Sequence, residues 1–485
     1  MIRCRSVRQE IYLRGILVTL CLTVLPVAMS PGQQSAETGA ARVPTGLGRG
    51  NPDTPRYFAS AAAATRAIAI CSGLWSANQT MADIDRYSPL HPEDAGHFET
   101  EIDGESRTVS ITYDPDMPPR IVVWRPVLGC TQLPVGARPE AKNPLPQVAA
   151  RIRTPELDEQ PWPLGDRDAV ATLPRAQQSK LDDVVDGAFD GTTYPGNTWG
   201  VVVVVNGKIA AERYAMNFDM HKGAQTHSAA KSFAASLLGI AVRQYGMNIH
   251  APGALEAWRR PGDPRNRITV NHLLRMNSGL YGEGNGSPQA DIYSNGATVA
   301  ERAVTNFLHT MPGSRFVYNP PDTMLLVRAI REVVNDDEKF LAMPFTELFW
   351  KLGMTRTTPS SDWNGDFLMS GQTYSTARDF ARFGLLYLGE GVFNGERILP
   401  EGWDRLVSTP ELAQPSGDGP GYGGQFWLYG GHEGLPDDAF AARGGMGQYI
   451  MIVRSQDLVI VRRGYDVGAS FPLDKFSADI IGALQ

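Results

Sequence analysis

The pattern of apolar and polar positions divides the chain into a leader, a small module, a linker and a large domain. Residues 31–54 are rich in Gly, Pro, Ser and Ala without periodicity, as in a flexible leader. In residues 55–135 an Ala-rich stretch precedes two β-branched runs, which predicts a small α+β module. Residues 136–180 carry repeated prolines and no periodicity, so we expect a linker. The module's helix is expected at 59–70 and its strands at 108–113 and 120–124.

The large domain, residues 181–485, opens on a β-hairpin. Residues 200–205 are one glycine followed by five valines, which predicts a strand buried on both faces. Asn206-Gly207 is the preferred pair for a type I′ turn, so the chain is expected to return along 208–214.

Helical periodicity follows the hairpin. Phe233, Leu237 and Ala241 recur at i, i+4 and i+8 and predict a helix over 228–245. Strands at both ends of the domain, with helices between them, imply a sheet assembled from distant segments. Further helices are expected at 269–276, 297–309, 322–334, 376–389 and 473–484, and strands at 425–428, 448–453 and 458–463.

The first thirty residues resemble a signal peptide. Four arginines precede an apolar run from Gly15 to Met29. A run of about 15 residues fits a secretory h-region better than a spanning helix, which needs about 20. An uncleaved anchor is the alternative. We therefore expect residues 1–30 to be removed, leaving a periplasmic or secreted protein with no integral membrane span.

Composition and charge exclude several classes. The 485 residues are 42% hydrophobic and 20% charged, which is ordinary for a globular protein and excludes a disordered, collagen-like or coiled-coil chain. A net charge of −7 without a basic tract argues against nucleic-acid binding. Removing the signal peptide leaves two cysteines, Cys71 and Cys130, which favours one disulfide, with two free thiols as the alternative. No CxxC or Cys/His cluster is present, so we expect neither a metal nor a cofactor.

The first candidate chemistry is an SxxK motif, Ser228 to Lys231, at a helix start. Spacing i, i+3 places both side chains on one helix face. A serine is a weak nucleophile and needs a base, and a lysine can serve if desolvation lowers its pKa. The motif alone is weak, because a capping serine and an unrelated lysine give the same letters.

Two later segments strengthen the interpretation of Ser228 and Lys231 as catalytic residues. Tyr318 follows a Pro-Gly turn, and a tyrosine near a lysine can ionise more easily and act as a general base. Residues 443–449, Arg-Gly-Gly-Met-Gly-Gln-Tyr, open an apolar strand whose glycines let a substrate approach. The three elements in this order favour a catalytic role, as in a hydrolase with a serine nucleophile, over a purely structural role in packing.

From about residue 195 to 485, about 60% of the chain, the sequence resembles the serine β-lactamase and penicillin-recognising superfamily. It is most similar to the branch of class C β-lactamases, carboxylesterases and six-aminohexanoate-dimer hydrolases. The resemblance implies an α/β sandwich, with a mostly antiparallel sheet flanked by helices, and a helical insertion. It lies in the segments 227–233, 268–280, 376–384, 394–400 and 447–452.

The resemblance also implies roles: Ser228 as nucleophile, Lys231 as its activating partner and Tyr318 as base. The backbone N–H groups of Ser228 and Gln448 are expected to form the oxyanion hole. Two positions depart from the family pattern. Gly445 stands where Lys or His is usual, and Asn319 comes one place early.

The candidate substrate-binding residues surround these motifs. A missing cation at Gly445 argues against tight recognition of a β-lactam carboxylate, unless Arg443 substitutes from nearby. The full set is Tyr281, Tyr293, Asn319, Arg443, Gly445 and Gly447. His227 beside Ser228 is expected to face elsewhere, because adjacent helix residues point about 100° apart.

The sequence thus predicts an exported serine hydrolase that cleaves a small-molecule amide or ester through an acyl-enzyme. A non-catalytic relative that binds peptidoglycan or another ligand, a β-lactamase or D-peptidase, and acyl transfer to an acceptor other than water are the alternatives. A non-catalytic protein has no need of all three of Ser228, Lys231 and Tyr318.

Overall fold

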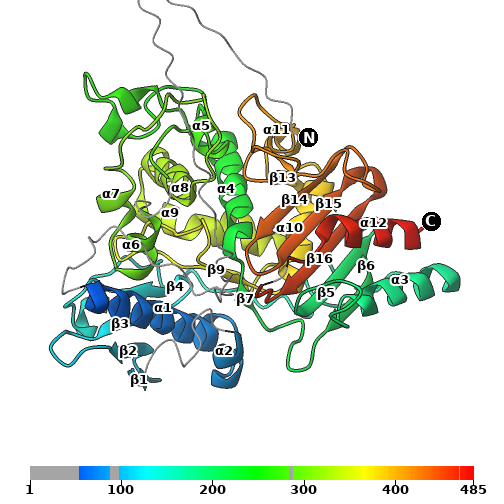
Figure 1. Cartoon of the computed structure of the whole chain (residues 1–485), viewed down its shortest axis with the longest axis horizontal. Helices are drawn as coiled ribbons and strands as arrows, with labels where there is room; N and C mark the ends of the chain where they lie inside the picture. The colour runs from blue at the N-terminus through cyan, green and yellow to red at the C-terminus, as the bar shows by residue number, and fades with distance from the viewer. Residues whose placement is uncertain (1–53, 88–97, 283–287, 469) are drawn as a thin grey trace, which may run out of the picture. The chain divides into compact units, whose positions relative to one another are not determined.

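The computed structural model describes residues 54–87, 98–282, 288–468 and 470–485. The predicted signal peptide and leader lie outside the described residues, apart from Thr54, where the first helix begins. The described chain contains a small N-terminal module and a large α/β domain with a mostly antiparallel sheet, as predicted (Figure 1).

The N-terminal module is one long helix packed on a four-stranded antiparallel sheet in the order β1-β2-β3-β4. The helix is longer than the Ala-rich stretch suggested. It is the one helix among the described residues that is long and apolar enough to cross a membrane, but 56% of the apolar window is already buried within the protein. The elements are α1 (Thr54–Ser76), α2 (Met81–Tyr87), β1 (Glu99–Asp103), β2 (Thr108–Thr112), β3 (Arg120–Arg125) and β4 (Gly129–Gln132).

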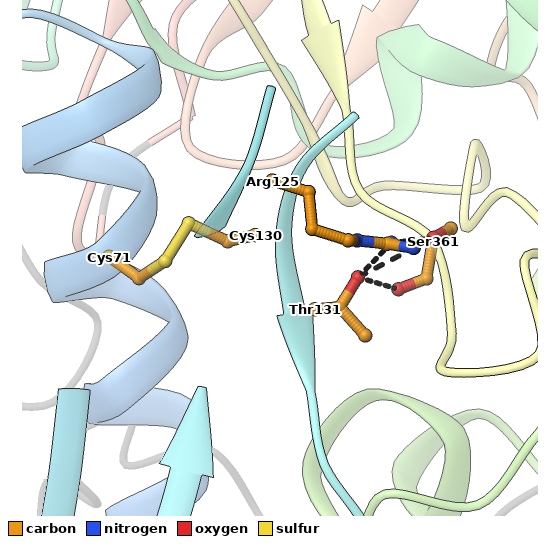
Figure 2. Close-up of a disulfide and its surroundings, with 5 residues drawn as sticks. All are labelled: Cys71, Arg125, Cys130, Thr131 and Ser361. Carbon is orange, nitrogen blue, oxygen red and sulfur yellow. Dashed lines mark hydrogen bonds between the residues drawn. A yellow bond between two sulfur atoms is a disulfide. The ribbon is translucent and has the colours of Figure 1, made fainter. Parts of the chain in front are cut away.

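The predicted disulfide joins α1 to β4. Cys71 and Cys130 are bonded, with their Cα atoms 6.1 Å apart, and both are buried in the module's core (Figure 2). On the neighbouring face of the same strands, Arg125 donates to the hydroxyl of Ser361 at 2.6 Å, and Thr131 donates to its carbonyl oxygen at 3.1 Å. The cross-linked strand β4 therefore also contacts the large domain.

The predicted linker has little regular structure but packs closely on the large domain. Trp162 is buried in the main core and donates its indole N–H to the carbonyl of Gly207 at 2.8 Å. Arg382 donates to the carbonyl of Pro163 at 2.8 Å. These contacts therefore hold the segment against the large domain.

The large domain is built on a seven-stranded antiparallel sheet in the order β12-β13-β14-β15-β16-β5-β6. β16 pairs with β5, so the two ends of the domain meet in the sheet, as the pattern predicted (Figure 1). Asn206 and Gly207 both have positive φ, 49° and 77°, as a type I′ turn requires. The strands are β5 (Thr198–Val205), β6 (Lys208–Tyr214), β12 (Gly421–Tyr422), β13 (Trp427–Leu428), β14 (Ala439–Gly444), β15 (Gln448–Val453) and β16 (Leu458–Gly464).

Helices cover both faces of this sheet. Val202 and Val204 pack with α4 and α10 in one core, whereas Val201 and Val203 pack with α3 and α12 in the other. The valine run is thus buried on both faces. The four helices are α3 (Arg175–Gly187), α4 (Ala230–Tyr245), α10 (Ala377–Leu388) and α12 (Leu473–Ala483).

The insertion between α4 and α10 is mainly helical. The helix predicted at 297–309 is much shorter, because the chain leaves it to pair with residues 280 and 281: Leu308 bridges Leu280, and Tyr281 donates to the carbonyl of Phe307 at 3.0 Å. The insertion holds α5 (Val270–Leu274), α6 (Gln289–Ser294), α7 (Val299–Arg302), α8 (Pro320–Val334) and α9 (Asp337–Met343). A small sheet orders β7 (Ala224–Gln225), β9 (Thr373–Ser375) and β8 (Thr358–Pro359), and the remaining short elements are β10 (Val392–Phe393), β11 (Glu396–Arg397) and α11 (Trp403–Val407).

Candidate active site

Ser228 lies in a tight turn between a strand and a buried helix. β7 leads into a single 3₁₀ turn, His227–Ala229, and α4 begins directly after it. His227 has a positive φ of 46°, a strained backbone for a residue other than glycine. Strain of this kind collects at functional sites, and here it lies in the turn that carries Ser228, which is half-buried.

Lys231 lies one helical turn on and is almost completely buried, at 1% exposure. Its ammonium nitrogen donates to the Ser228 hydroxyl oxygen at 3.0 Å and to the carbonyl oxygen of Ser370 at 2.5 Å. Burial lowers the pKa of Lys231 to about 7, because the charged form loses its hydration. Over the described ranges no carboxylate forms an ion pair with it to offset that loss. A large fraction of the lysine is therefore neutral at pH 7.

Tyr318 is the third member of the group formed with Ser228 and Lys231, and it lies two residues before the start of α8. Its ring centre lies 5.0 Å from the Lys231 nitrogen, and its hydroxyl is hydrogen-bonded to Ser228. Burial raises the pKa of Tyr318 to about 12, although the bond to Ser228 and the charge of Arg443 act in the opposite direction. The expectation that this tyrosine ionises easily is therefore wrong. Burial outweighs its neighbours, and Tyr318 stays protonated at neutral pH.

An open pocket of about 430 Å³ gives access to Ser228. Tyr318, Trp427 and Tyr449 form aromatic walls, and the backbone of residues 444–447 forms the strand-edge side. Gly445 and Gly447 thus line the pocket, where they were predicted. Such a cleft, with aromatic walls and a few convergent polar groups, is typical of a small-molecule site.

Arg443 also lines this pocket. Its guanidinium lies 5.8 Å from the ring centre of Trp427 and 5.9 Å from that of Tyr449, and it donates to the Tyr429 hydroxyl at 3.2 Å. No acidic partner is found for it in the part of the chain that the structure describes. A cation therefore lies at this pocket, two residues before Gly445 in the sequence.

The backbone of Gly444 lies against the nucleophile turn, and Gly445 follows it along the pocket. A methyl group on Gly444 would collide with the carbonyl oxygen of Thr226 and would lie 3.0 Å from the amide nitrogen of Ala229. Gln448 pairs with Gly444 across the ladder, but its side chain is buried between Arg463 and the carbonyl of Gly464. Gln448 does not line the pocket that holds Ser228.

Three predicted substrate-binding residues lie elsewhere. Tyr281 stacks on Phe307, with ring centres 5.2 Å apart. The amide of Asn319 donates to Asp322 at 2.7 Å. The Tyr293 hydroxyl is hydrogen-bonded to Ser370, behind Lys231. None of the three lines the pocket of Ser228.

The structure also places side chains that the sequence analysis did not select. Ser370 accepts from Lys231, yet it lies in a loop without any motif. Trp427 forms a pocket wall and was noted only as part of a strand. Both reach the site through tertiary folding, so no local pattern could have identified them.

His227 does not line the pocket that holds Ser228. Its imidazole lines a separate cavity with Tyr374 and Gln448. Burial, with the charges of Arg463 and Lys231, lowers its pKa to about 4, so it stays neutral. As expected from their spacing, His227 and Ser228 line different cavities.

One group of described residues has the geometry to hold a metal ion. Asp158, Asp166 and His221 place ligand atoms within 4.8 Å of one another. Both carboxylates are already paired with arginines, Asp158 with Arg356 and Asp166 with Arg382. This cluster does not line the pocket of Ser228, and its charges are balanced without a metal.

A family model described as Beta-lactamase matches residues 185–462, more than half of the chain. The chain belongs to the beta-lactamase family. The matched range contains Ser228, Lys231, Tyr318 and Arg443. A search of curated proteins gives no match.

Solved structures with the beta-lactamase fold agree with this assignment. A protein described as a 6-aminohexanoate-dimer hydrolase from Bacillus anthracis has a TM-score of 0.50 and 20% identity, covering 68% of this chain and 85% of its own. A family VIII carboxylesterase has a TM-score of 0.52 and 14% identity, covering 65% and 98%. A protein described as a beta-lactamase from Bacteroides dorei has a TM-score of 0.51 and 18% identity, covering 63% and 98%. At these identities the likeness shows the fold alone, and the family is one of hydrolases.

Proposed function

We propose that this protein is an exported serine hydrolase that cleaves amide or ester bonds of small molecules through an acyl-enzyme on Ser228. One observation carries the proposal: a serine hydroxyl, a lysine amine and a tyrosine hydroxyl meet beside one open pocket. The family's fold and its hydrolase relatives support the same reaction class.

Lys231 is the base in this proposal. The Ser228 oxygen attacks the substrate carbonyl carbon, and its proton passes to the neutral amine of Lys231. Negative charge then develops on the carbonyl oxygen. The backbone N–H groups of Ser228 and Gly445 are the donors that we assign to it, because Gly444 lies against the nucleophile turn and Gly445 follows it in the pocket that holds Ser228.

Tyr318 is the acid. When the tetrahedral intermediate collapses, the bond to the leaving amine or alcohol breaks and the protonated Tyr318 hydroxyl gives that group its proton. Lys231 then returns a proton to Tyr318. In the second half, water attacks the acyl carbon and gives its proton to Lys231. The acid departs, and Ser228 regains its proton.

Arg443 suggests which substrates fit. A cation that faces the pocket without an acidic partner among the described residues can pair with a substrate carboxylate, and a guanidinium does this bidentately. The substrate class that we propose is therefore an amide or ester whose acyl or leaving part carries a carboxylate. This replaces the weak recognition of a carboxylate that Gly445 alone implied.

Export is supported by the basic and apolar N-terminus together with a buried disulfide. Disulfides persist in oxidising compartments and are rare in the cytosol. The proposed location is the periplasm or the extracellular medium.

A fluorophosphonate probe tests the central claim. We expect it to add to the tryptic peptide that contains Ser228, and Ser228→Ala to abolish the labelling. Labelling of a different serine, or none in the folded protein, would mean a different mechanism or a non-catalytic binding protein. Turnover of p-nitrophenyl butyrate, a carboxylate-bearing linear amide and nitrocefin then separates esterase, amidase and β-lactamase activity, and product analysis separates hydrolysis from acyl transfer.

A further inference from the structure

Lys231 depends on one fixed acceptor besides the nucleophile. Its ammonium has two hydrogen-bond acceptors among the described residues, the Ser228 hydroxyl and the carbonyl of Ser370. The side-chain amide of Asn319, which follows Tyr318, donates to the carboxylate of Asp322 and not to Lys231. The position of the Ser370 carbonyl therefore determines where the amine of Lys231 lies.

Tyr293 holds Ser370 from behind. Its hydroxyl is hydrogen-bonded to the Ser370 hydroxyl, and a methyl group on the next residue, Gly371, would lie only 3.1 Å from the same tyrosine oxygen. The tyrosine thus packs directly over residues 370 and 371. It belongs to α6, a short helix of the insertion.

The N-terminal module holds α6. Helix α1 packs against it. The Tyr57 hydroxyl donates to Asp291 at 3.1 Å and accepts from the amide of Asn295 at 2.7 Å. Further along α1, the hydroxyls of Thr65 and Ser294 are hydrogen-bonded at 3.2 Å. These contacts bracket Tyr293 on both sides.

The disulfide fixes the other end of this arrangement. Cys71 lies on α1, after Thr65, and its bond to β4 ties the helix to the strands that contact Ser361. Ser361 lies in the same loop region, between β8 and β9, that carries Ser370. The module therefore contacts the loop between β8 and β9 directly, through β3 and β4. It also acts on this loop indirectly, through α6 of the insertion.

We propose that the N-terminal module is part of the catalytic apparatus: α1 holds α6, and Tyr293 on α6 is a positioning residue that keeps the Ser370 carbonyl where Lys231 needs it. This inference rests on the proposed function, in which Lys231 takes the Ser228 proton. Small displacements of a base cost rate steeply, because proton transfer needs hydrogen-bond geometry.

Tyr293→Phe and Tyr57→Phe test it in the full mature chain, because each removes one hydroxyl and keeps the ring. For Tyr293→Phe we expect kcat on p-nitrophenyl butyrate, and the rate constant for fluorophosphonate labelling, to fall at least about 10-fold with KM within about twofold. Tyr57→Phe should lower both rates less. The double variant should match Tyr293→Phe alone, because both residues act along one path. Tyr113→Phe is the matched control, since Tyr113 belongs to the same module and has no polar contact with α6 among the described residues.

Three results would overturn the proposal: unchanged kcat and labelling rate in Tyr293→Phe, a loss confined to thermal stability, or losses that multiply in the double variant. A second readout covers failure of the proposed function itself, which would appear as an unlabelled wild-type Ser228. In protein with ¹³Cε-labelled lysine, the NMR signal that Lys231→Ala removes should shift in Tyr57→Phe and Tyr293→Phe but not in Tyr113→Phe. An unmoved signal overturns the positioning role whether or not Ser228 reacts.

Discussion

The amine of Lys231 lies 3.0 Å from the hydroxyl oxygen of Ser228, in a position that is 99% shielded from water. Shielding and proximity act together here. Burial discourages the charged amine, and the serine hydroxyl that it contacts faces the pocket. The predictions below follow from this pair and from the groups around it.

The pH dependence of kcat/KM should show a single acidic limb. Only neutral Lys231 can accept the serine proton, and its pKa is lowered to about 7, so activity should rise through that pH and level off above it. The plateau should persist to about pH 9, because the pKa of Tyr318 is raised to about 12 and this acid stays protonated. Ester hydrolysis measured at constant ionic strength checks this. A limb centred near the ordinary lysine pKa would contradict the role of burial.

Lys231→Ala and Tyr318→Phe should each lower kcat by at least about 10²-fold with folding retained, because each removes one end of the proton path. Their combination should lose little more than either alone, since the two groups act as one unit. Steady-state kinetics and circular dichroism on all three variants decide the matter. Near-wild-type turnover in Tyr318→Phe would remove Tyr318 from the mechanism.

Arg443→Gln should separate substrates by charge. Loss of the guanidinium should reduce kcat/KM for a carboxylate-bearing amide or for nitrocefin by about 10- to 100-fold, as expected when a charge-assisted pair is lost. p-Nitrophenyl butyrate, which has no carboxylate, should change by less than about threefold on the same principle. Equal losses on both substrates would show that Arg443 supports the pocket walls and does not read charge.

Two neighbouring glycines should respond differently to alanine. A methyl group at Gly444 collides with the carbonyl of Thr226, whereas at Gly445 its nearest neighbour is His227 at 4.0 Å. Gly444→Ala should therefore displace the nucleophile turn and lower kcat by about 10-fold or more, while Gly445→Ala keeps most activity. Comparable kinetics in the two variants would place the oxyanion backbone elsewhere.

The disulfide should stabilise the module measurably. Cys71 and Cys130 are 59 residues apart, and closing a loop of that size is worth about 4 kcal/mol in the chain-entropy model. The double variant with alanine at both positions should unfold at lower urea concentration, with a shift reproduced by reducing the wild type. Peptide mapping without reductant checks the bond itself, and two free thiols in protein produced in an oxidising compartment would refute it.

Local signals explain what the sequence could and could not predict. The valine run and Asn206-Gly207 specify a buried hairpin through their own backbone preferences. β14 was missed because Ala439–Gly444 consists mainly of small residues without β-branching. Helix α3 was missed because few apolar residues, Leu181 and Val185 among them, mark its buried face.

The same division holds at the site. Ser228 and Lys231 are neighbours on one helix, so their spacing alone brings them together. Ser370 and Tyr293 reach Lys231 only after the insertion has folded, and the direction of the pKa of Tyr318 depends on burial that no motif records. Chemistry encoded locally was predictable, and its supporting contacts were not.

The pairing of β5 with β16 also bears on when the protein can fold. Residues near 200 pair with residues near 460, so the central sheet stays incomplete until the chain has been made through β16. Contacts of such high sequence separation form slowly, because a long loop must close before they stabilise anything. A sheet of this kind cannot be completed while β16 is still unmade. The pairing of β16 with β5 is therefore the step that joins the two ends of the domain into one native sheet.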